Sequence, residues 1–322
     1  MSHCLYPQIA TYKEEWLTVS QHHQIYIEQS GNPNGIPVVY LHGGPGGGSS
    51  ENHRRYFDPE IYRIILFDQR GCGKSLPTLS LDNNTTWDLV NDIEAIRKHL
   101  LIDKWLVSGG SWGTTLALCY GIKYSDKILA FILRGIFLGT QKEYDWLYKS
   151  DGAARFFPDY YREFSSVLAQ GEQADPLIGY HRIFQGNNEL AKTSASKAWY
   201  LWELRLSTIE YQHIKPLKVE DTHKALCMAQ LSSYYFYQNC FLNENYIMAN
   251  MSEIAEIPAI IIHGRYDMVC QLGVADELVN AWENATLQIL TQAGHSGFES
   301  QTIDAICKAT DTMASFLNES HQ

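Results

Sequence analysis

The fold is decided by one stretch, Trp105-Leu106-Val107-Ser108-Gly109-Gly110-Ser111-Trp112-Gly113, which runs on into Thr114-Thr115-Leu116-Ala117-Leu118. A short apolar strand, a serine flanked by glycines and a helix-like segment follow one another, as in the G-x-S-x-G nucleophile elbow. Such a turn is so sharp that the serine is strained and its neighbours must be small. The stretch therefore predicts a Ser111 hydroxyl above a sheet, beside the N-terminus of a helix. A glycine-serine loop without chemistry is the other interpretation, because the bare pattern also arises by chance.

A serine hydroxyl needs a base that removes its proton and a third group that orients the base. Around an elbow of this type, the chain order is serine, acid, histidine, each just past the carboxyl end of a strand. Asp267 follows a predicted strand at 260–263, and His295 follows another at 286–290. These positions predict a catalytic triad of Ser111, Asp267 and His295.

Acyl transfer also needs backbone N–H groups that bind the oxyanion. A predicted strand at 36–41 runs into the loop His42-Gly43-Gly44-Pro45-Gly46-Gly47-Gly48, whose bare backbone can approach a ligand closely. We expect the N–H groups of Gly44 and Trp112 to form the oxyanion hole.

Two other features near strand ends, a glycine-lysine-serine segment and a pair of histidines, are not expected to take part in the chemistry. Gly73-Lys74-Ser75 mimics the end of a phosphate-binding loop, but Asp68 stands where the first glycine should be and no long apolar helix follows. We therefore reject a nucleotide site. His42 and His263 also end strands, and we expect them to be structural hydrogen-bonding residues.

Buried strands alternate with helical stretches along most of the chain, which predicts an α/β fold with a mostly parallel sheet and helices on both faces. An antiparallel pair at 16–19 and 24–28 is expected to open the sheet. Between Leu138 and Tyr246 recognisable strands disappear, and this third of the chain holds half of its aromatic residues. We predict a catalytic core over 1–137 and 248–322, with a helical cap over 138–247.

The composition limits the function. The chain has 322 residues, 45% of them hydrophobic, and a net charge of −11. This charge argues against nucleic acid and anionic membranes as partners, since both require a basic surface. No secretory signal or membrane-spanning run is apparent. The seven cysteines lack the spacing of a disulfide framework, so we expect free thiols and a cytoplasmic location.

Six segments together resemble one known family: His42–Gly48, Asp68–Ser75, Gly109–Gly113, Leu133–Phe137, His263–Cys270 and Gly294–Ser296. They are similar to those of proline iminopeptidases, which are α/β-hydrolases that release N-terminal proline from peptides. The resemblance spans about residues 10 to 317. It implies a serine exopeptidase that forms an acyl-enzyme at Ser111 and uses no metal or cofactor.

The resemblance also implies substrate-binding residues. Three aromatic residues match the family's pocket: Phe137, Trp146 and Phe236. Glu203 matches a carboxylate that holds the cationic nitrogen of the substrate. The family has a second glutamate where this chain has Ser232, and an arginine where it has Gln230. Two substrate classes stay open: peptides with N-terminal proline held by Glu203 alone, or another small apolar acyl group, as in an esterase or amidase. A binding protein on a hydrolase scaffold is the alternative of a different class.

Overall fold

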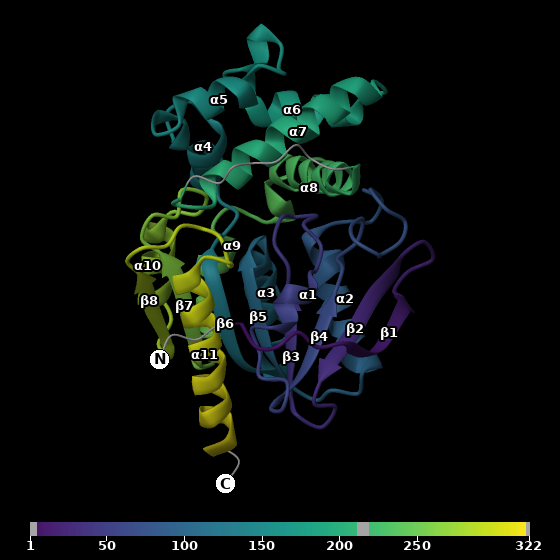
Figure 1. Cartoon of the computed structure of the whole chain (residues 1–322), viewed down its shortest axis with the longest axis vertical. Helices are drawn as coiled ribbons and strands as arrows, with labels where there is room; N and C mark the ends of the chain where they lie inside the picture. Colours follow the sequence, from purple (N-terminus) through teal and green to yellow (C-terminus); the bar gives the residue numbers. More distant parts are fainter. Residues whose placement is uncertain (1–4, 211–218, 320–322) are drawn as a thin grey trace.

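The computed structural model describes residues 5–210 and 219–319 (Figure 1). Eight strands form one sheet in the order β1-β2-β4-β3-β5-β6-β7-β8. Their bounds are β1 Thr11–Thr18, β2 Gln24–Gly31, β3 Ile36–Leu41, β4 Tyr62–Phe67, β5 Trp105–Ser111, β6 Ile128–Ile136, β7 Ala259–Gly264 and β8 Ala285–Leu290. β2 is antiparallel to β1 and β4, and every other neighbouring pair is parallel. The predicted opening pair and the mostly parallel sheet are confirmed.

The parallel strands are apolar throughout because helices cover both faces of the sheet. In β3, Val39 and Leu41 face a cluster that includes α2, α3 and α10, whereas Val38 and Tyr40 face the cluster of α11. The bounds of the core helices are α1 Glu51–Arg54, α2 Thr86–His99, α3 Trp112–Lys123, α10 Leu272–Asn280 and α11 Ser300–Glu319.

A layer of helices lies between β6 and β7 in the chain and sits above the sheet in Figure 1. We call it the helical layer: α4 Gln141–Tyr148, α5 Pro158–Ser165, α6 Pro176–Gln185, α7 Glu189–Leu206 and α8 Val219–Tyr237. The short α9, Tyr246–Ala249, follows it and contacts α3. Every element described between these two strands is helical. The boundaries at 138 and 247 stay a prediction, since α9 straddles the second of them.

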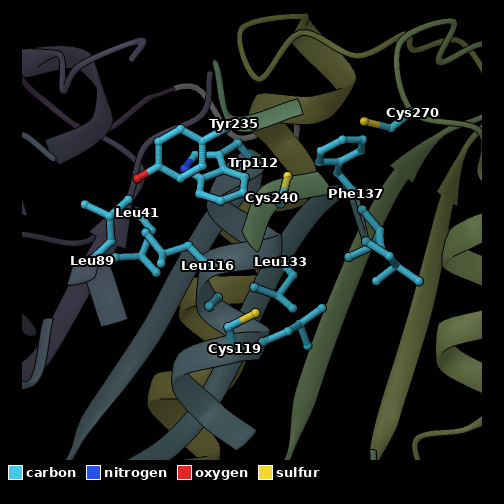
Figure 2. Close-up of a cluster of buried hydrophobic side chains, with 14 of the residues drawn as sticks. Leu41, Leu89, Trp112, Leu116, Cys119, Leu133, Phe137, Tyr235, Cys240 and Cys270 are labelled. Carbon is cyan, nitrogen blue, oxygen red and sulfur yellow. The ribbon is translucent and has the colours of Figure 1, made fainter. Parts of the chain in front are cut away.

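One apolar cluster runs from the sheet through α3 into the helical layer (Figure 2). Trp112, the first residue of α3, is completely buried, and its ring meets Tyr235 of α8 edge to face at a centroid distance of 5.1 Å. Leu41, Leu116 and Leu133 continue this cluster beneath the two rings. Aromatic contacts of this kind bury large areas. The helical layer is therefore anchored directly on the helix that follows Ser111.

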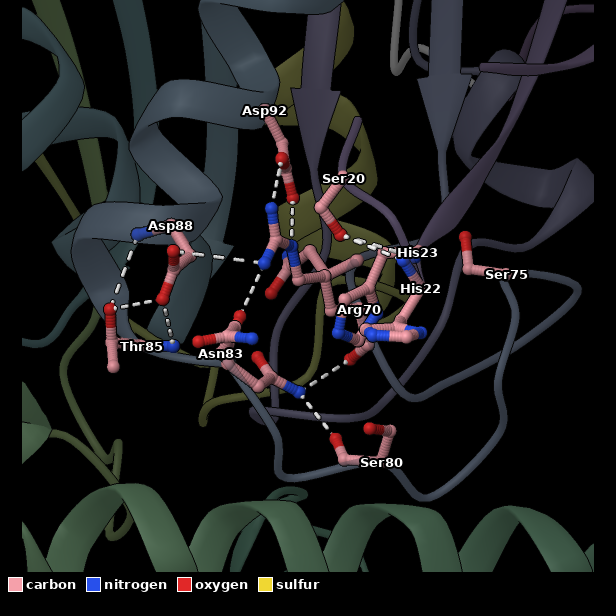
Figure 3. Close-up of polar contacts among 12 residues, drawn as sticks. Ser20, His22, His23, Arg70, Ser75, Ser80, Asn83, Thr85, Asp88 and Asp92 are labelled. Atoms are coloured by element: carbon pink, nitrogen blue, oxygen red, sulfur yellow. Dashed lines mark hydrogen bonds and ion pairs between the residues drawn. The ribbon is translucent and has the colours of Figure 1, made fainter. Parts of the chain in front are cut away.

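A buried ion pair holds the loop after β4 in place (Figure 3). Arg70 binds Asp92 of α2 through two hydrogen bonds, Nε to Oδ2 at 2.6 Å and Nη2 to Oδ1 at 2.7 Å. The carbonyl oxygen of Arg70 accepts a hydrogen bond from Asn84, whose Oδ1 accepts one from the hydroxyl of Tyr235. The ion pair is thus linked through Asn84 to α8.

The same loop carries the segment that mimics a phosphate-binding loop. Its own aspartate accepts N–H groups from two loops: Lys74 N of this segment donates to Asp68 Oδ2 at 2.8 Å, and Ser49 N of the loop after β3 donates to Oδ1 at 2.7 Å. A carboxylate therefore occupies the position that a phosphate would need. This arrangement agrees with the rejection of a nucleotide site.

Candidate active site

Ser111 lies where β5 ends and α3 begins. Its backbone angles are φ 58° and ψ −129°, a conformation that side-chain-bearing residues rarely adopt and that stores strain. A Cβ atom at Gly113 would collide with the carbonyl oxygen of Leu41 on β3. These features confirm the predicted elbow, because only a small residue lets α3 pass this close to the sheet.

The loops after β7 and β8 bring Asp267 and His295 together. His295 Nδ1 lies 2.7 Å from Asp267 Oδ2, while Oδ1 accepts the N–H groups of Val269 at 3.0 Å and Cys270 at 2.7 Å. Burial alone would raise the pKa of Asp267, but the charge and hydrogen bond of His295, with smaller contributions from His263 and Cys270, lower it. The aspartate is therefore ionised and accepts the Nδ1 proton, which leaves Nε2 of His295 free to act as a base.

The end of β6 lies between Ser111 and the Asp267–His295 pair. Ser111 pairs with Ile136 in the ladder, and a Cβ atom on Gly135 would lie 3.1 Å from His295 Cε1 and 3.5 Å from Asp267 Oδ2. Among the residues that the structure describes, no hydrogen bond joins the Ser111 hydroxyl to the His295 ring. Such contacts are often long without substrate and shorten in the complex.

His263 has a structural role beside the pair. Its Nδ1 accepts the N–H of Ile136 at 3.2 Å, and its Nε2 donates to the carbonyl oxygen of Cys270 at 2.9 Å. Burial lowers the pKa of His263, so the ring is neutral and both nitrogens are occupied. The expectation of a structural hydrogen-bonding residue is confirmed here.

A hydrogen-bonded chain joins Trp112 to His42, which begins the loop that carries Gly44. Gln69 N donates to His42 Nε2 at 3.1 Å, Gln69 Nε2 donates to the carbonyl oxygen of His42 at 2.9 Å, and the Trp112 ring donates to Gln69 Oε1 at 2.9 Å. His42 is thus structural as well. Gly44 has a φ of +120° and lines the same cavity as Ser111, while Trp112 opens α3, where the first N–H groups have no partner within the helix.

A cavity of about 20 Å³ opens beside Ser111, room for about one water molecule. Its lining consists of Gly44, Ser111, Phe137, Leu147, Tyr148, Glu203, Phe236, Val269 and Cys270. Phe137 and Phe236 meet edge to face with ring centroids 5.5 Å apart. The structure therefore brings to Ser111 one predicted oxyanion donor, Gly44, and three predicted substrate-binding residues, Phe137, Glu203 and Phe236. A ligand larger than water requires these side chains to move.

Glu203 supplies the carboxyl group of this lining. It projects from α7, is 8% exposed, and accepts a hydrogen bond from the Tyr148 hydroxyl at 2.7 Å. Burial raises the pKa of Glu203 to about 7, although the Tyr148 hydroxyl acts in the opposite direction. A buried carboxyl group of this kind is poised to ionise when a cation arrives.

Comparison with known proteins adds the evolutionary relationship. Residues 36–302 match the family model described as "alpha/beta hydrolase fold". A proline iminopeptidase of Xanthomonas citri is 45% identical over 96% of this chain and 99% of its own length. One from Arabidopsis thaliana is 42% identical over 97% of this chain and 83% of its own length. The chain belongs to the proline iminopeptidase family.

Solved structures share the fold at lower identity. A haloalkane dehalogenase variant from Bradyrhizobium elkanii matches with a TM-score of 0.66 and 15% identity, over 96% of this chain and 98% of that one. A structure described as a putative lipase from Acinetobacter baumannii matches with a TM-score of 0.61 and 17% identity, over 96% and 93%. At these identities the likeness supports the fold alone.

Two residues singled out by resemblance to proline iminopeptidases lie outside the cavity lining. Trp146 donates from Nε1 to the carbonyl oxygen of Met268 at 2.9 Å, next to the loop of Asp267. Ser232, which stands where the family has a glutamate, is fully buried and donates to the carbonyl oxygen of Pro45 at 2.9 Å. The role of Trp146 in substrate binding stays a prediction, and Ser232 contacts the loop that carries Gly44.

Sequence reasoning missed two contributors to the site. Tyr148 lies in an aromatic-rich segment where nothing distinguished it from its neighbours. Arg134 donates from Nη1 to the carbonyl oxygen of His295 at 2.7 Å, and a Cβ atom on Gly110 would lie only 2.5 Å from its Nε. Arg134 belongs to the family segment Leu133–Phe137, and that segment was its only signal.

Two negative findings apply to residues 5–210 and 219–319. No group of three or more histidine, cysteine, aspartate or glutamate side chains is placed to hold a metal ion. No helix in these ranges combines the length and apolarity that crossing a bilayer would require.

Proposed function

We propose that this protein is a prolyl aminopeptidase, a serine exopeptidase that releases N-terminal proline from small peptides. One observation carries the proposal: the strained Ser111 and the buried Glu203 line the same small cavity. A peptide whose N-terminal nitrogen reaches Glu203 presents its first carbonyl group to Ser111. The full-length similarity to proline iminopeptidases supports the same substrate class.

In the first half of the proposed reaction, Ser111 Oγ attacks the carbonyl carbon of the prolyl residue while His295 Nε2 takes the hydroxyl proton. Asp267 holds the imidazole in the required tautomer and stabilises the imidazolium. The N–H groups of Gly44 and Trp112 bind the oxyanion, and losing one such donor costs about 3–4 kcal/mol of transition-state stabilisation. The carbon–nitrogen bond then breaks, and His295 returns the proton to the departing amine.

The second half of the reaction hydrolyses the prolyl ester on Ser111. Water attacks the ester carbonyl while His295 takes one of its protons, and the same two N–H groups bind the new oxyanion. Collapse of this intermediate breaks the ester bond, and His295 protonates Ser111 as free proline leaves. Every step uses side chains and backbone groups of this chain.

Glu203 supplies the selectivity for a free N-terminus in this proposal. A protonated secondary amine loses its hydration when it enters an apolar pocket, so it needs an anion there. Phe137 and Phe236 provide the apolar surface for the pyrrolidine ring. We retain Trp146 as a predicted pocket residue that must be tested by substitution.

We also propose a cytoplasmic location. The six cysteines of the described residues are all buried and free, which fits a reducing compartment.

A panel of aminoacyl arylamides tests the activity, with Ser111→Ala as the control. We expect wild type to cleave the prolyl compound fastest, and Ser111→Ala to lose turnover while it retains the fold. N-acetylation of the prolyl compound removes the cationic nitrogen and should slow hydrolysis by at least about a hundredfold, a cost of about 3 kcal/mol. Preference for the acetylated compound would instead support an esterase or amidase. Failure of a fluorophosphonate to label Ser111 would support a binding protein.

A further inference from the structure

The backbone of the histidine loop, residues 294–297, is held by the helical layer. The carbonyl oxygen of Ser207 accepts two hydrogen bonds from this loop, from His295 N at 2.9 Å and from Ser296 N at 2.7 Å. Ser207 is the C-cap residue that directly follows α7, and its hydroxyl donates to the carbonyl oxygen of Glu203 at 2.7 Å. The helix that carries the substrate-facing carboxylate therefore ends on the backbone of the proposed base.

Glu299 strengthens this junction with a second pair of hydrogen bonds. Its Oε2 accepts Gly294 N at 2.7 Å, and its Oε1 accepts Ile209 N at 3.0 Å. One carboxylate thus bridges the histidine loop and the segment just after α7. Hydrogen bonds to a charged acceptor are roughly twice as strong as neutral ones.

The loop is held on its other side by the sheet. Arg134 of β6 donates to the carbonyl oxygen of His295 at 2.7 Å. The position of the His295 ring is therefore set by two bodies, the sheet through Arg134 and α7 through Ser207 and Glu299. Glu203 lies one helical turn before Ser207, so a movement of α7 at Glu203 would also move the backbone of His295 through these hydrogen bonds.

We propose that Glu299 is a positioning residue that fastens the end of α7 to the histidine loop, so that capture of the substrate's cationic nitrogen at Glu203 sets the place of the His295 ring. The inference rests on the proposed function, because it assigns the nitrogen to Glu203. Glu299 acts through backbone groups and does not touch the substrate. A purely structural Glu299 would instead affect all substrates equally.

Glu299→Gln is the informative variant, because the amide keeps one acceptor and turns the other atom into a donor that faces an N–H group. Glu283→Gln, which changes an exposed glutamate after α10, is the matched control. We expect Glu299→Gln to lower kcat for a prolyl arylamide by about tenfold, the effect of one lost hydrogen bond, with KM changed less than about twofold. Glu299→Asp keeps the charge but shortens the side chain, so its kcat should lie between those of wild type and Glu299→Gln.

A double-mutant cycle with Glu203→Gln tests the connection itself. On the prolyl arylamide, Glu299→Gln should lower kcat by about tenfold in the wild-type background. In a protein that already carries Glu203→Gln, it should lower kcat by less than about threefold. On a small acyl ester without an amine, Glu299→Gln should lower kcat by less than about threefold in both backgrounds. Titration of Ser111 with a fluorophosphonate counts folded sites, so a partly misfolded variant still yields kcat per site.

The outcomes separate the two proposals. An equal loss on the arylamide and the ester, or additive losses in the cycle, would overturn the positioning role while leaving the peptidase intact. A wild-type protein that cleaves the ester but not the prolyl arylamide would overturn the proposed function, and the connection with it.

Discussion

Tyr148 of α4 and Glu203 of α7 are joined by a hydrogen bond of 2.7 Å inside the cavity of Ser111. Burial raises the pKa of the Glu203 carboxyl group to about 7. Near neutral pH the cavity therefore changes between a neutral and an anionic form. This change makes both the kinetics and the stability of the protein depend on pH in a way that can be measured.

The first prediction concerns the pH dependence of substrate capture. The kcat/KM of a prolyl arylamide should fall as the pH drops through about 7, because Glu203 becomes protonated and no longer binds a cation. An ester without an amine reports only the ionisation of the catalytic base. We expect a steeper acid limb for the arylamide than for the ester in wild type, and equal limbs in Glu203→Gln. Identical limbs in wild type would contradict the role of Glu203.

The second prediction concerns stability. The pKa of Glu203 is raised from 4.5 in the unfolded chain to about 7 in the folded protein. The protonated carboxyl group therefore stabilises the fold fully below pH 4.5, and this contribution is lost as the pH rises through 7. Glu203→Gln keeps a neutral acceptor for Tyr148 at all pH values. Urea unfolding should show that it gains stability over wild type between about pH 5 and pH 8.5, on the order of 3 kcal/mol.

The third prediction concerns the loop that carries Gly44. Ser232→Ala removes the buried hydrogen bond to the Pro45 carbonyl oxygen and leaves that acceptor unsatisfied. We expect kcat to fall by about tenfold with little change in KM, because the Gly44 N–H is displaced from the oxyanion. Ser233→Ala is the matched control, since Ser233 is equally buried on α8 but bonds only to Gln230 within the helix. Equal kinetic effects of the two substitutions would argue against the contact with the loop.

The fourth prediction concerns the buried ion pair of Figure 3. Arg70→Met leaves Asp92 buried without its partner, which should destabilise the protein by about 3–5 kcal/mol in urea unfolding. Adding Asp92→Leu removes the uncompensated charge, so the double variant should recover part of that loss. A double variant less stable than Arg70→Met alone would show that Asp92 has another essential contact.

Much of the fold could be predicted because its strands are short apolar runs that end in recognisable loops. The same logic located Ser111, Asp267 and His295, since parallel strands bring their carboxyl ends to one edge of the sheet. The choice between Trp146 and Tyr148 could not be made in this way. These residues lie two positions apart on α4 and so project in different directions, and only the docking of the helix decides which one faces the cavity.

Contacts made by the backbone were also beyond prediction. The carbonyl oxygen of Ser207 would accept the same hydrogen bonds from almost any residue, so the sequence carries no sign of it. Glu299 looks like an ordinary surface glutamate until the end of α7 and the histidine loop are placed side by side. The sequence shows that Ser232 replaces a glutamate of the family. It does not show the hydrogen bond from Ser232 to Pro45, which depends on how α8 packs.

The order of the strands along the chain has a consequence for the biosynthesis of the protein. β5 and its elbow are translated early, whereas β7 and β8, which position Asp267 and His295, follow the whole helical layer in the chain. A growing polypeptide on the ribosome therefore exposes its serine long before it possesses a base. On the proposed mechanism, hydrolysis cannot begin until β8 and the histidine loop that follows it have emerged and folded against β5.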